Sequence, residues 1–298
     1  MSAETDTPYR GRFAPSPTGP LHFGSLVTAL ASYLEARCHD GAWLVRIEDL
    51  DPLRESPQAI DSILHSLEAH SLFWDETVRR QSLRLDRYRQ LLDRLIQQRR
   101  AYTCGCSRKE LLAHGGRHPF KCRDGGHAPP ERPLATRFAL NDEVARWQDL
   151  ILGPQQQTVN AELDDPVLLR KEGFIAYQLA VVADDIDQDI SHVIRGSDLL
   201  ETTAQQNQIR RALKVALPEY GHIPVILNQQ GQKLSKQNYA PALNDDAPAN
   251  NLWHALQALG QQPPPELARA TADELLAWAR TNWCRARIPL VSHQQPEA

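Results

Sequence analysis

A histidine and two glycines stand in the stretch RFAPSPTGPLHFGS, from Arg12 to Ser25, which leads into an expected helix. Glycines allow close approach of the backbone, and free N–H groups at a helix start bind phosphate together with the helix dipole. His22 lies one turn before the helix and adds a hydrogen-bond donor. The alternative is a turn whose histidine only caps the helix.

A second stretch, KLSK from Lys233 to Lys236, follows a glycine and a short expected strand. Two lysines around a serine on a loop suit a mobile clamp on a polyphosphate, although a solvated pair of lysines on a turn has the same sequence. Each stretch is weak alone. Both together, in this order and with this separation, predict a nucleotide site.

Three of the five cysteines cluster between positions 104 and 122. Cys104, Cys106, His118 and Cys122 offer three thiolates and an imidazole, a set that suits tetrahedral zinc. Four protein ligands leave no open position, so we expect a structural site. The alternatives are His114 or His127 as the imidazole ligand, and a loop of reduced cysteines without metal.

The elements that must position these residues indicate an α/β fold. A strand expected at 9–14, a helix from Ser25 and a strand at 42–49 form a βαβ unit, which predicts a parallel sheet. Apolar spacing predicts helices around 60–67 and 88–95. We expect a Rossmann-type parallel-sheet catalytic domain with an inserted zinc-binding subdomain and a short helical C-terminal appendage. The expected division is 8–100 and 171–240 for the two catalytic halves, 101–170 for the insertion and 241–298 for the appendage.

Composition is that of an ordinary globular protein, with 41% hydrophobic and 23% charged residues and a net charge of −4. A mildly acidic total does not exclude a local basic face that binds RNA. The N-terminus has no apolar segment typical of a signal peptide, and the run from Phe174 to Ala183 is too short to span a bilayer. We therefore expect a cytoplasmic protein without a membrane partner.

RFAPSPTGPLHFG resembles the HIGH-type signature of class I aminoacyl-tRNA synthetases, and KLSK resembles their KMSKS loop. RFAPSPTG, RIEDLD (46–51) and HVIRGSDLL (192–200) point to the glutamyl branch, and the resemblance runs from about Tyr9 to Gln237. It implies activation of glutamate by ATP, with Mg²⁺ assisting. His22, Lys233 and Lys236 are the expected catalytic residues. The expected ATP contacts are Pro15, His22, Gly24, Ser25, Lys233, Ser235 and Lys236.

The same resemblance implies a glutamate pocket. Its expected residues are Arg12, Phe13, Ala14, Ser16, Glu48, Tyr177 and Arg195. A guanidinium binds a carboxylate through two hydrogen bonds, so Arg12 and Arg195 suit the substrate carboxylates, and Glu48 suits its ammonium. The alternative for Arg12 and Glu48 is a structural ion pair at a strand end. The role of Asp198 stays open between the ATP side and structure.

The first stretch ends in HFGS, whereas full-length relatives usually have a second histidine in place of Ser25. This ending and the C-x-C step resemble the glutamyl-Q tRNA(Asp) synthetase subfamily. The chain also ends 61 residues after Gln237, too few for the relatives' anticodon-binding region. The subfamily commonly has Tyr-x₃-Cys after C-x-C, so His118 departs from the pattern and should strengthen metal binding. The resemblance implies tRNA-independent activation of glutamate and its transfer to the queuosine base at the wobble position of tRNA(Asp).

The expected partners are L-glutamate and the anticodon stem-loop of tRNA(Asp) carrying queuosine, bound by a monomer. Single-stranded loops with splayed bases are the usual targets of specific RNA recognition. Two basic clusters could contact phosphates, unless they are solvated faces: Arg210, Arg211 and Lys214, and Arg280, Arg285 and Arg287. Two other functions stay open, a conventional glutamyl-tRNA synthetase that charges a 3′ end and a non-catalytic paralogue that binds an amino acid or RNA.

Overall fold

A computed structural model of the chain describes residues 8–126, 129–227, 231, 241–291 and 293–294. The first half alternates strands and helices as expected. Its elements are β1 (Arg10–Phe13), α1 (Phe23–Cys38), β2 (Ala42–Ile47), α2 (Pro57–Ala69), β3 (Arg79–Arg80) and α3 (Leu85–Gln97). β1 pairs in parallel with β2, and β2 in parallel with β3, so the expected βαβ unit is confirmed.

The parallel sheet continues through strands from the second half of the chain. β9 (His192–Gly196) pairs in parallel with β10 (Glu219–Ile223). β9 lies beside β1, where the backbone N–H of Ser191 donates to the Arg10 carbonyl at 3.1 Å. The spatial order is therefore β3-β2-β1-β9-β10. In such sheets ligands bind at the strands' carboxyl ends where the order reverses, here between β1 and β9.

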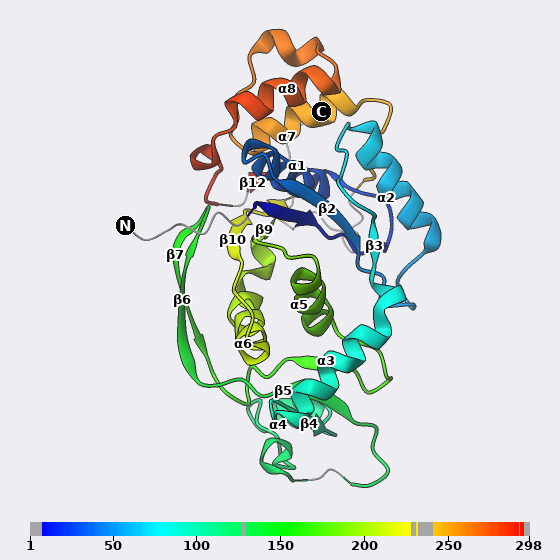
Figure 1. Cartoon of the computed structure of the whole chain (residues 1–298), viewed down its shortest axis with the longest axis vertical. Helices are drawn as coiled ribbons and strands as arrows, with labels where there is room; N and C mark the ends of the chain where they lie inside the picture. The colour runs from blue at the N-terminus through cyan, green and yellow to red at the C-terminus, as the bar shows by residue number, and fades with distance from the viewer. Residues whose placement is uncertain (1–7, 127–128, 228–230, 232–240, 292, 295–298) are drawn as a thin grey trace.

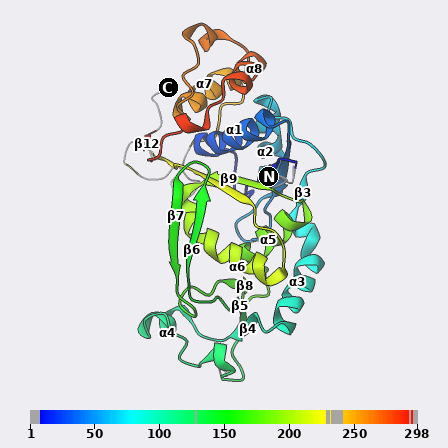
Figure 2. The ribbon, with the colours of Figure 1, turned by 60° about the vertical axis from the view of Figure 1, so that its left-hand side comes forward.

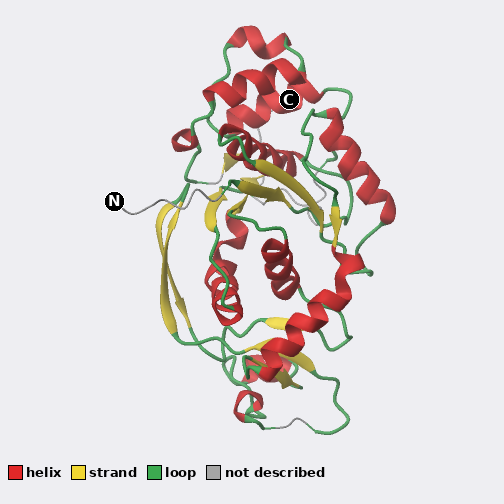
Figure 3. Ribbon diagram, in the orientation of Figure 1, coloured by secondary structure: helices red, strands yellow, loops and turns green. Residues whose placement is uncertain are grey.

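Helices cover both faces of this sheet (Figures 1 and 3). α5 (Tyr177–Asp187) and α6 (Thr203–Leu213) lie on one side, and α1 lies on the other with the C-terminal helices α7 (Pro248–Ala258) and α8 (Ala272–Asn282). Leu26 and Leu30 of α1 share one apolar cluster with Leu252 and Leu276. The C-terminal helices therefore complete the core.

The segment with the cysteines forms its own small sheet at the end of the molecule far from α8 (Figure 1). β4 (Ala101–Cys104), β5 (Ala135–Phe138) and β8 (Val167–Leu169) pair antiparallel, next to the short helix α4 (Arg108–Ala113). A long hairpin of β6 (Glu143–Asp149) and β7 (Gly153–Val159) returns from this sheet to β10, as Figure 2 shows. The hairpin links the small sheet to the main one.

The short strand expected before KLSK is the two-residue strand β11 (Ile226–Leu227), which pairs with β12 (His293–Gln294). No helix in the described part of the chain has the length and apolarity to cross a bilayer.

Candidate active site

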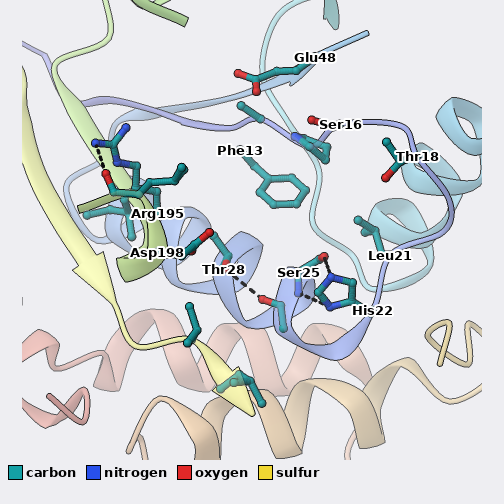
Figure 4. Close-up of a pocket in the computed structure, with 18 of the residues that line it drawn as sticks. Phe13, Ser16, Thr18, Leu21, His22, Ser25, Thr28, Glu48, Arg195 and Asp198 are labelled. Atoms are coloured by element: carbon teal, nitrogen blue, oxygen red, sulfur yellow. Dashed lines mark hydrogen bonds between the residues drawn. The ribbon is translucent and has the colours of Figure 1, made fainter. Parts of the chain in front are cut away.

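A pocket of about 610 Å³ opens at the carboxyl ends of β1, β2 and β9 (Figure 4). The predicted ATP and glutamate residues within the described ranges all line it: Arg12, Phe13, Ala14, Pro15, Ser16, His22, Gly24, Ser25, Glu48, Tyr177 and Arg195. Asp198 lines it as well. The remaining residues predicted for this pocket, Lys233, Ser235 and Lys236, lie outside the described residues.

Arg12, near the end of β1, is almost fully buried, with 4% of its surface exposed. Its Nε donates to Asp185 Oδ1 over 3.2 Å. Its two Nη groups make no hydrogen bond with any described residue, and they belong to a side chain that lines the pocket. Arg12 therefore offers a guanidinium fork to a carboxylate ligand.

Glu48 follows β2 directly and is 9% exposed. Its Oε1 lies 3.4 Å from an Nη of Arg46, and no ion pair with Arg12 forms within the described residues. Burial raises the pKa of Glu48 to about 7, against the lowering by Arg46 and Arg12. The expected alternative, an Arg12–Glu48 ion pair, is thus wrong, because each residue has a different partner behind the pocket wall. A ligand ammonium would complete the pairing of Glu48.

Arg195 on β9 is held more tightly than we expected. Its Nε donates to His222 at 3.0 Å, one Nη to Gln206 at 2.8 Å, and the other Nη to Thr203 at 2.9 Å and the Leu199 carbonyl at 3.2 Å. A guanidinium has five N–H donors, so one N–H of this pocket-lining side chain has no hydrogen-bond partner among the described residues. The expectation of a bidentate fork from Arg195 is therefore corrected to a single-point donor in this structure.

Tyr177 begins α5 and lies beside these charges. Burial raises the pKa of its hydroxyl, so Tyr177 stays protonated and able to donate a hydrogen bond.

His22 caps α1, as the alternative interpretation of the first stretch expects, and it also lines the pocket. Its Nδ1 accepts from the backbone N–H of Ser25 at 3.2 Å, and its Nε2 lies 3.1 Å from Ser25 Oγ (Figure 4). Since Nδ1 is an acceptor, the neutral ring carries its proton on Nε2. Gly24 permits this packing, because a Cβ there would lie 3.3 Å from the ring.

The predicted metal ligands converge at the other end of the molecule. Donor atoms of Cys104, Cys106, His118 and Cys122 all lie within 4.8 Å of one another, and all four residues are buried. Cys104 Sγ lies 3.1 Å from His118 Nδ1, and Cys106 Sγ lies 3.7 Å from Cys122 Sγ. Neighbouring sulfur ligands of tetrahedral zinc are about 3.8 Å apart for Zn–S bonds of about 2.3 Å. The cluster is therefore compatible with zinc.

The surroundings of the cluster also suit a metal. Burial raises the pKa of Cys106 to about 12, so a nearby cation would be needed to hold its thiolate. The Nε2 of His118 lies 3.4 Å from the Tyr102 hydroxyl, which donates to Asp165 at 2.7 Å. Such outer contacts orient metal-bound histidines. The rival ligand His114 is exposed and bonds to the Glu110 carbonyl instead, whereas His127 lies outside the described residues.

Comparison with known proteins identifies the family of the chain that carries the pocket and the cysteine cluster. The family profile described as tRNA synthetases class I (E and Q), catalytic domain, matches residues 9–282. The chain belongs to this family. Membership makes it a ligase of the aminoacyl-tRNA synthetase type and implies ATP as a substrate.

Curated relatives define the branch. A glutamyl-Q tRNA(Asp) synthetase of Pseudomonas aeruginosa (strain LESB58) is 46% identical over 281 residues, which cover 94% of this chain and 95% of the relative. One of Pseudomonas fluorescens is 45% identical over 289 residues, covering 97% and 96%. Among solved structures, a glutamate tRNA ligase from Elizabethkingia meningosepticum in complex with its amino acid is similar, with a TM-score of 0.78 and 26% identity. That match covers 97% of this chain and 67% of the ligase. The chain is thus a member of the glutamyl-Q tRNA(Asp) synthetase branch.

Two of the basic residues expected to contact RNA hold partners within the chain. Arg210 is 4% exposed and donates to the Ala216 carbonyl, so it is not available to a phosphate. Arg285 binds the buried carboxylate of Glu35. Exposed Arg211 pairs with Glu143 at 3.0 Å.

Sequence reasoning missed the buried groups behind the pocket. Asp185 holds both Arg12 and Arg46, and Asp149 holds His222. The one signal for Asp185 is that two aspartates interrupt an apolar helix after Ala183, because buried carboxylates require partners. His222 and Asp149 give no comparable signal, since each stands singly in an ordinary strand.

Proposed function

We propose that this synthetase activates L-glutamate with ATP, without requiring tRNA, and transfers it to the queuosine base at the wobble position of tRNA(Asp). The observation that carries the amino-acid part is the charge arrangement of the pocket. It combines the Arg12 fork, the single Arg195 donor and the incompletely paired Glu48 carboxylate. An amino acid with a side-chain carboxylate matches this arrangement, because its two carboxylates can pair with the two arginines and its ammonium with Glu48.

Buried charges without partners are costly, so a ligand of the wrong charge pattern is disfavoured. Glutamine would leave one guanidinium facing a neutral amide, and aspartate, which is shorter by one methylene, would place its second carboxylate differently. We therefore infer selectivity for glutamate, with Tyr177 and Ser16 adding hydrogen bonds.

Activation needs no side-chain nucleophile. An oxygen of the glutamate α-carboxylate attacks the α-phosphorus of ATP, the bond to the β-phosphate oxygen breaks, and pyrophosphate leaves. The chain contributes position and charge stabilisation. His22 and the first turn of α1 would face the triphosphate, with Pro15, Gly24 and Ser25 as further ATP contacts. Lys233, Ser235 and Lys236 remain proposed partners of the phosphates. Mg²⁺ would supply charge neutralisation on the phosphate oxygens.

In the second step a nucleophilic group of the acceptor attacks the carbonyl carbon of the glutamyl adenylate, and AMP leaves. The proposal of queuosine as acceptor is supported by the names of relatives about 46% identical to this chain. We place the reaction in the cytoplasm, because its substrate is tRNA. We assign a structural role to zinc at the cysteine cluster.

The similarity to a glutamate tRNA ligase favours one second candidate, which is charging of a tRNA 3′ end. Periodate separates the two, because it destroys a free 3′ terminal diol and so prevents charging there. Glutamate incorporation into tRNA whose 3′ end was oxidised before the queuosine base was installed would exclude 3′ charging.

The experiment that tests activation is pyrophosphate exchange in the absence of tRNA, with a panel of glutamate, glutamine and aspartate. Exchange with glutamate alone is the expected result. Exchange only when tRNA is added would contradict tRNA-independent activation, and no exchange under either condition would contradict the enzyme mechanism.

A further inference from the structure

Behind the pocket, three buried side chains form a line that ends on Arg195. Asp149 Oδ2 lies 2.6 Å from Nδ1 of His222, and Nε2 of His222 lies 3.0 Å from Nε of Arg195. Asp149 and His222 are at most 1% exposed, and neither lines the pocket. The aspartate comes from the end of β6, the histidine from β10 and the arginine from β9.

Hydrogen-bond chemistry fixes the protons along this line. An arginine Nε always carries a proton and can only donate, so His222 Nε2 must be the acceptor. His222 is then neutral with its proton on Nδ1, which donates to Asp149. Asp149 Oδ1 also accepts from the backbone N–H groups of His222, Ile151 and Leu152, at 2.9–3.0 Å. These donors hold Asp149 in the ionised state that selects this tautomer.

Other groups around His222 agree with a neutral ring. Burial lowers the pKa of His222, and the cations Arg195 and Arg12 lower it further, against the raising effect of Asp149. Tyr220, on the same strand, stacks on the ring with centroids 6.0 Å apart. The Thr203 hydroxyl oxygen lies 3.4 Å from Nε2 of His222 and is uncharged. Asp149 is the carboxylate in hydrogen-bond contact with the ring.

We propose that Asp149 and His222 are positioning residues that fix the Arg195 guanidinium for a substrate carboxylate. This inference rests on the proposed function, which assigns Arg195 to glutamate. Asp149 closes the β6–β7 hairpin, so the hairpin would contribute to amino-acid recognition through a residue that never touches the ligand.

The decisive variant is Asp149→Asn. An amide keeps one oxygen for the three backbone donors but turns an N–H toward His222 Nδ1. The ring must then carry its proton on Nε2, where it opposes the Arg195 N–H. Loss of one charge-assisted hydrogen bond predicts a rise of about tenfold or more in the KM for glutamate, with kcat changed by less than about threefold. The KM for ATP should not move.

A second pair of variants checks the link at the histidine. His222→Phe removes the acceptor and should raise the glutamate KM as Asp149→Asn does. His222→Gln retains an acceptor oxygen and should recover part of the loss. The matched control is Glu35→Gln, which also neutralises a buried carboxylate in an arginine ion pair, at a residue that does not line the pocket. It should lower Tm and leave the glutamate KM unchanged.

The outcomes separate the two claims. Wild-type exchange with an unchanged glutamate KM in folded Asp149→Asn protein would overturn the positioning role alone. Equal rises in the KM values for ATP and glutamate would overturn it too, because they indicate general damage. A wild-type protein without glutamate-dependent exchange would overturn the proposed function and this inference together. If Asp149→Asn does not fold, the two His222 variants decide in the same way.

Discussion

Ser25 contacts both ring nitrogens of His22, with its backbone N–H 3.2 Å from Nδ1 and its hydroxyl 3.1 Å from Nε2. The serine that ends the HFGS stretch therefore has a physical role, which is to hold the imidazole over the start of α1. The hydroxyl oxygen accepts the Nε2 proton, so it fixes both the tautomer and the orientation of the ring.

Ser25→Ala removes this hydroxyl and should lower the kcat of glutamate-dependent pyrophosphate exchange by about two- to tenfold, the range of one neutral hydrogen bond. The glutamate KM should stay the same, because His22 is proposed to face ATP and not the glutamate. Thr281→Ala is the control, since it deletes a hydroxyl on an exposed helix face. An unchanged kcat in Ser25→Ala would contradict this role.

Glu48→Gln should raise the glutamate KM by about a hundredfold, because the variant cannot pair with an ammonium in a buried site. The same change should leave Tm unaltered or raise it at about pH 8, since an ionised carboxylate at this 9% exposed position is disfavoured by burial. Glutamate-dependent pyrophosphate exchange measures the KM, and thermal melting measures the Tm. A large drop in Tm would instead indicate a structural ion pair with Arg46.

Glutamate affinity should rise as pH increases through about 7. In the free protein the pKa of Glu48 is raised to about 7, chiefly by burial, whereas an unfolded glutamate titrates near about 4.3. The folded state therefore binds this proton more tightly, and the stability that it contributes is full below about pH 4 and is lost as pH rises to about 7.

Binding of an ammonium favours the carboxylate, so glutamate should displace the proton from Glu48. Calorimetric titration near pH 7 in buffers of different ionisation enthalpy should report release of a fraction of one proton per site, and Glu48→Gln should abolish it. Proton uptake on binding would contradict the assignment of Glu48 to the ammonium.

The cysteine cluster should hold about one zinc ion per chain, as four buried donors are expected to do. Cys106→Ser should lower both the metal content and Tm, because zinc binding contributes directly to the stability of such small subdomains. Elemental analysis with differential scanning calorimetry measures both. Cys284→Ser, at a cysteine outside the cluster, is the control and should change neither. Purified wild-type protein without any bound metal would contradict the prediction.

Much of the pocket was predictable because a parallel sheet brings strand ends to one edge. Arg12 and Arg195 lie near the ends of β1 and β9, and Glu48 directly follows β2. A parallel βαβ topology is therefore enough to bring these residues together. The cysteine cluster was predictable from ligand types alone.

The supporting contacts were not predictable, because they join residues far apart in the chain. Arg12 and Asp185 are 173 positions apart, and Asp149 and His222 are 73 apart. Their pairing depends on how β6 docks on β10 and how α5 packs under the sheet, which local patterns do not encode. The same holds for Arg285, whose partner Glu35 lies 250 positions away.

Queuosine in tRNA(Asp) is the proposed acceptor of glutamate. The most direct test is transfer of labelled glutamate to tRNA(Asp) with and without queuosine. Both RNAs should be oxidised with periodate at the 3′ end and repurified, with the queuosine base installed after oxidation so that its own diol stays intact. Label only on the queuosine-containing RNA is the predicted result. Label on untreated tRNA(Glu) that disappears after periodate, with none on queuosine-containing tRNA(Asp), would contradict the account and establish 3′ charging.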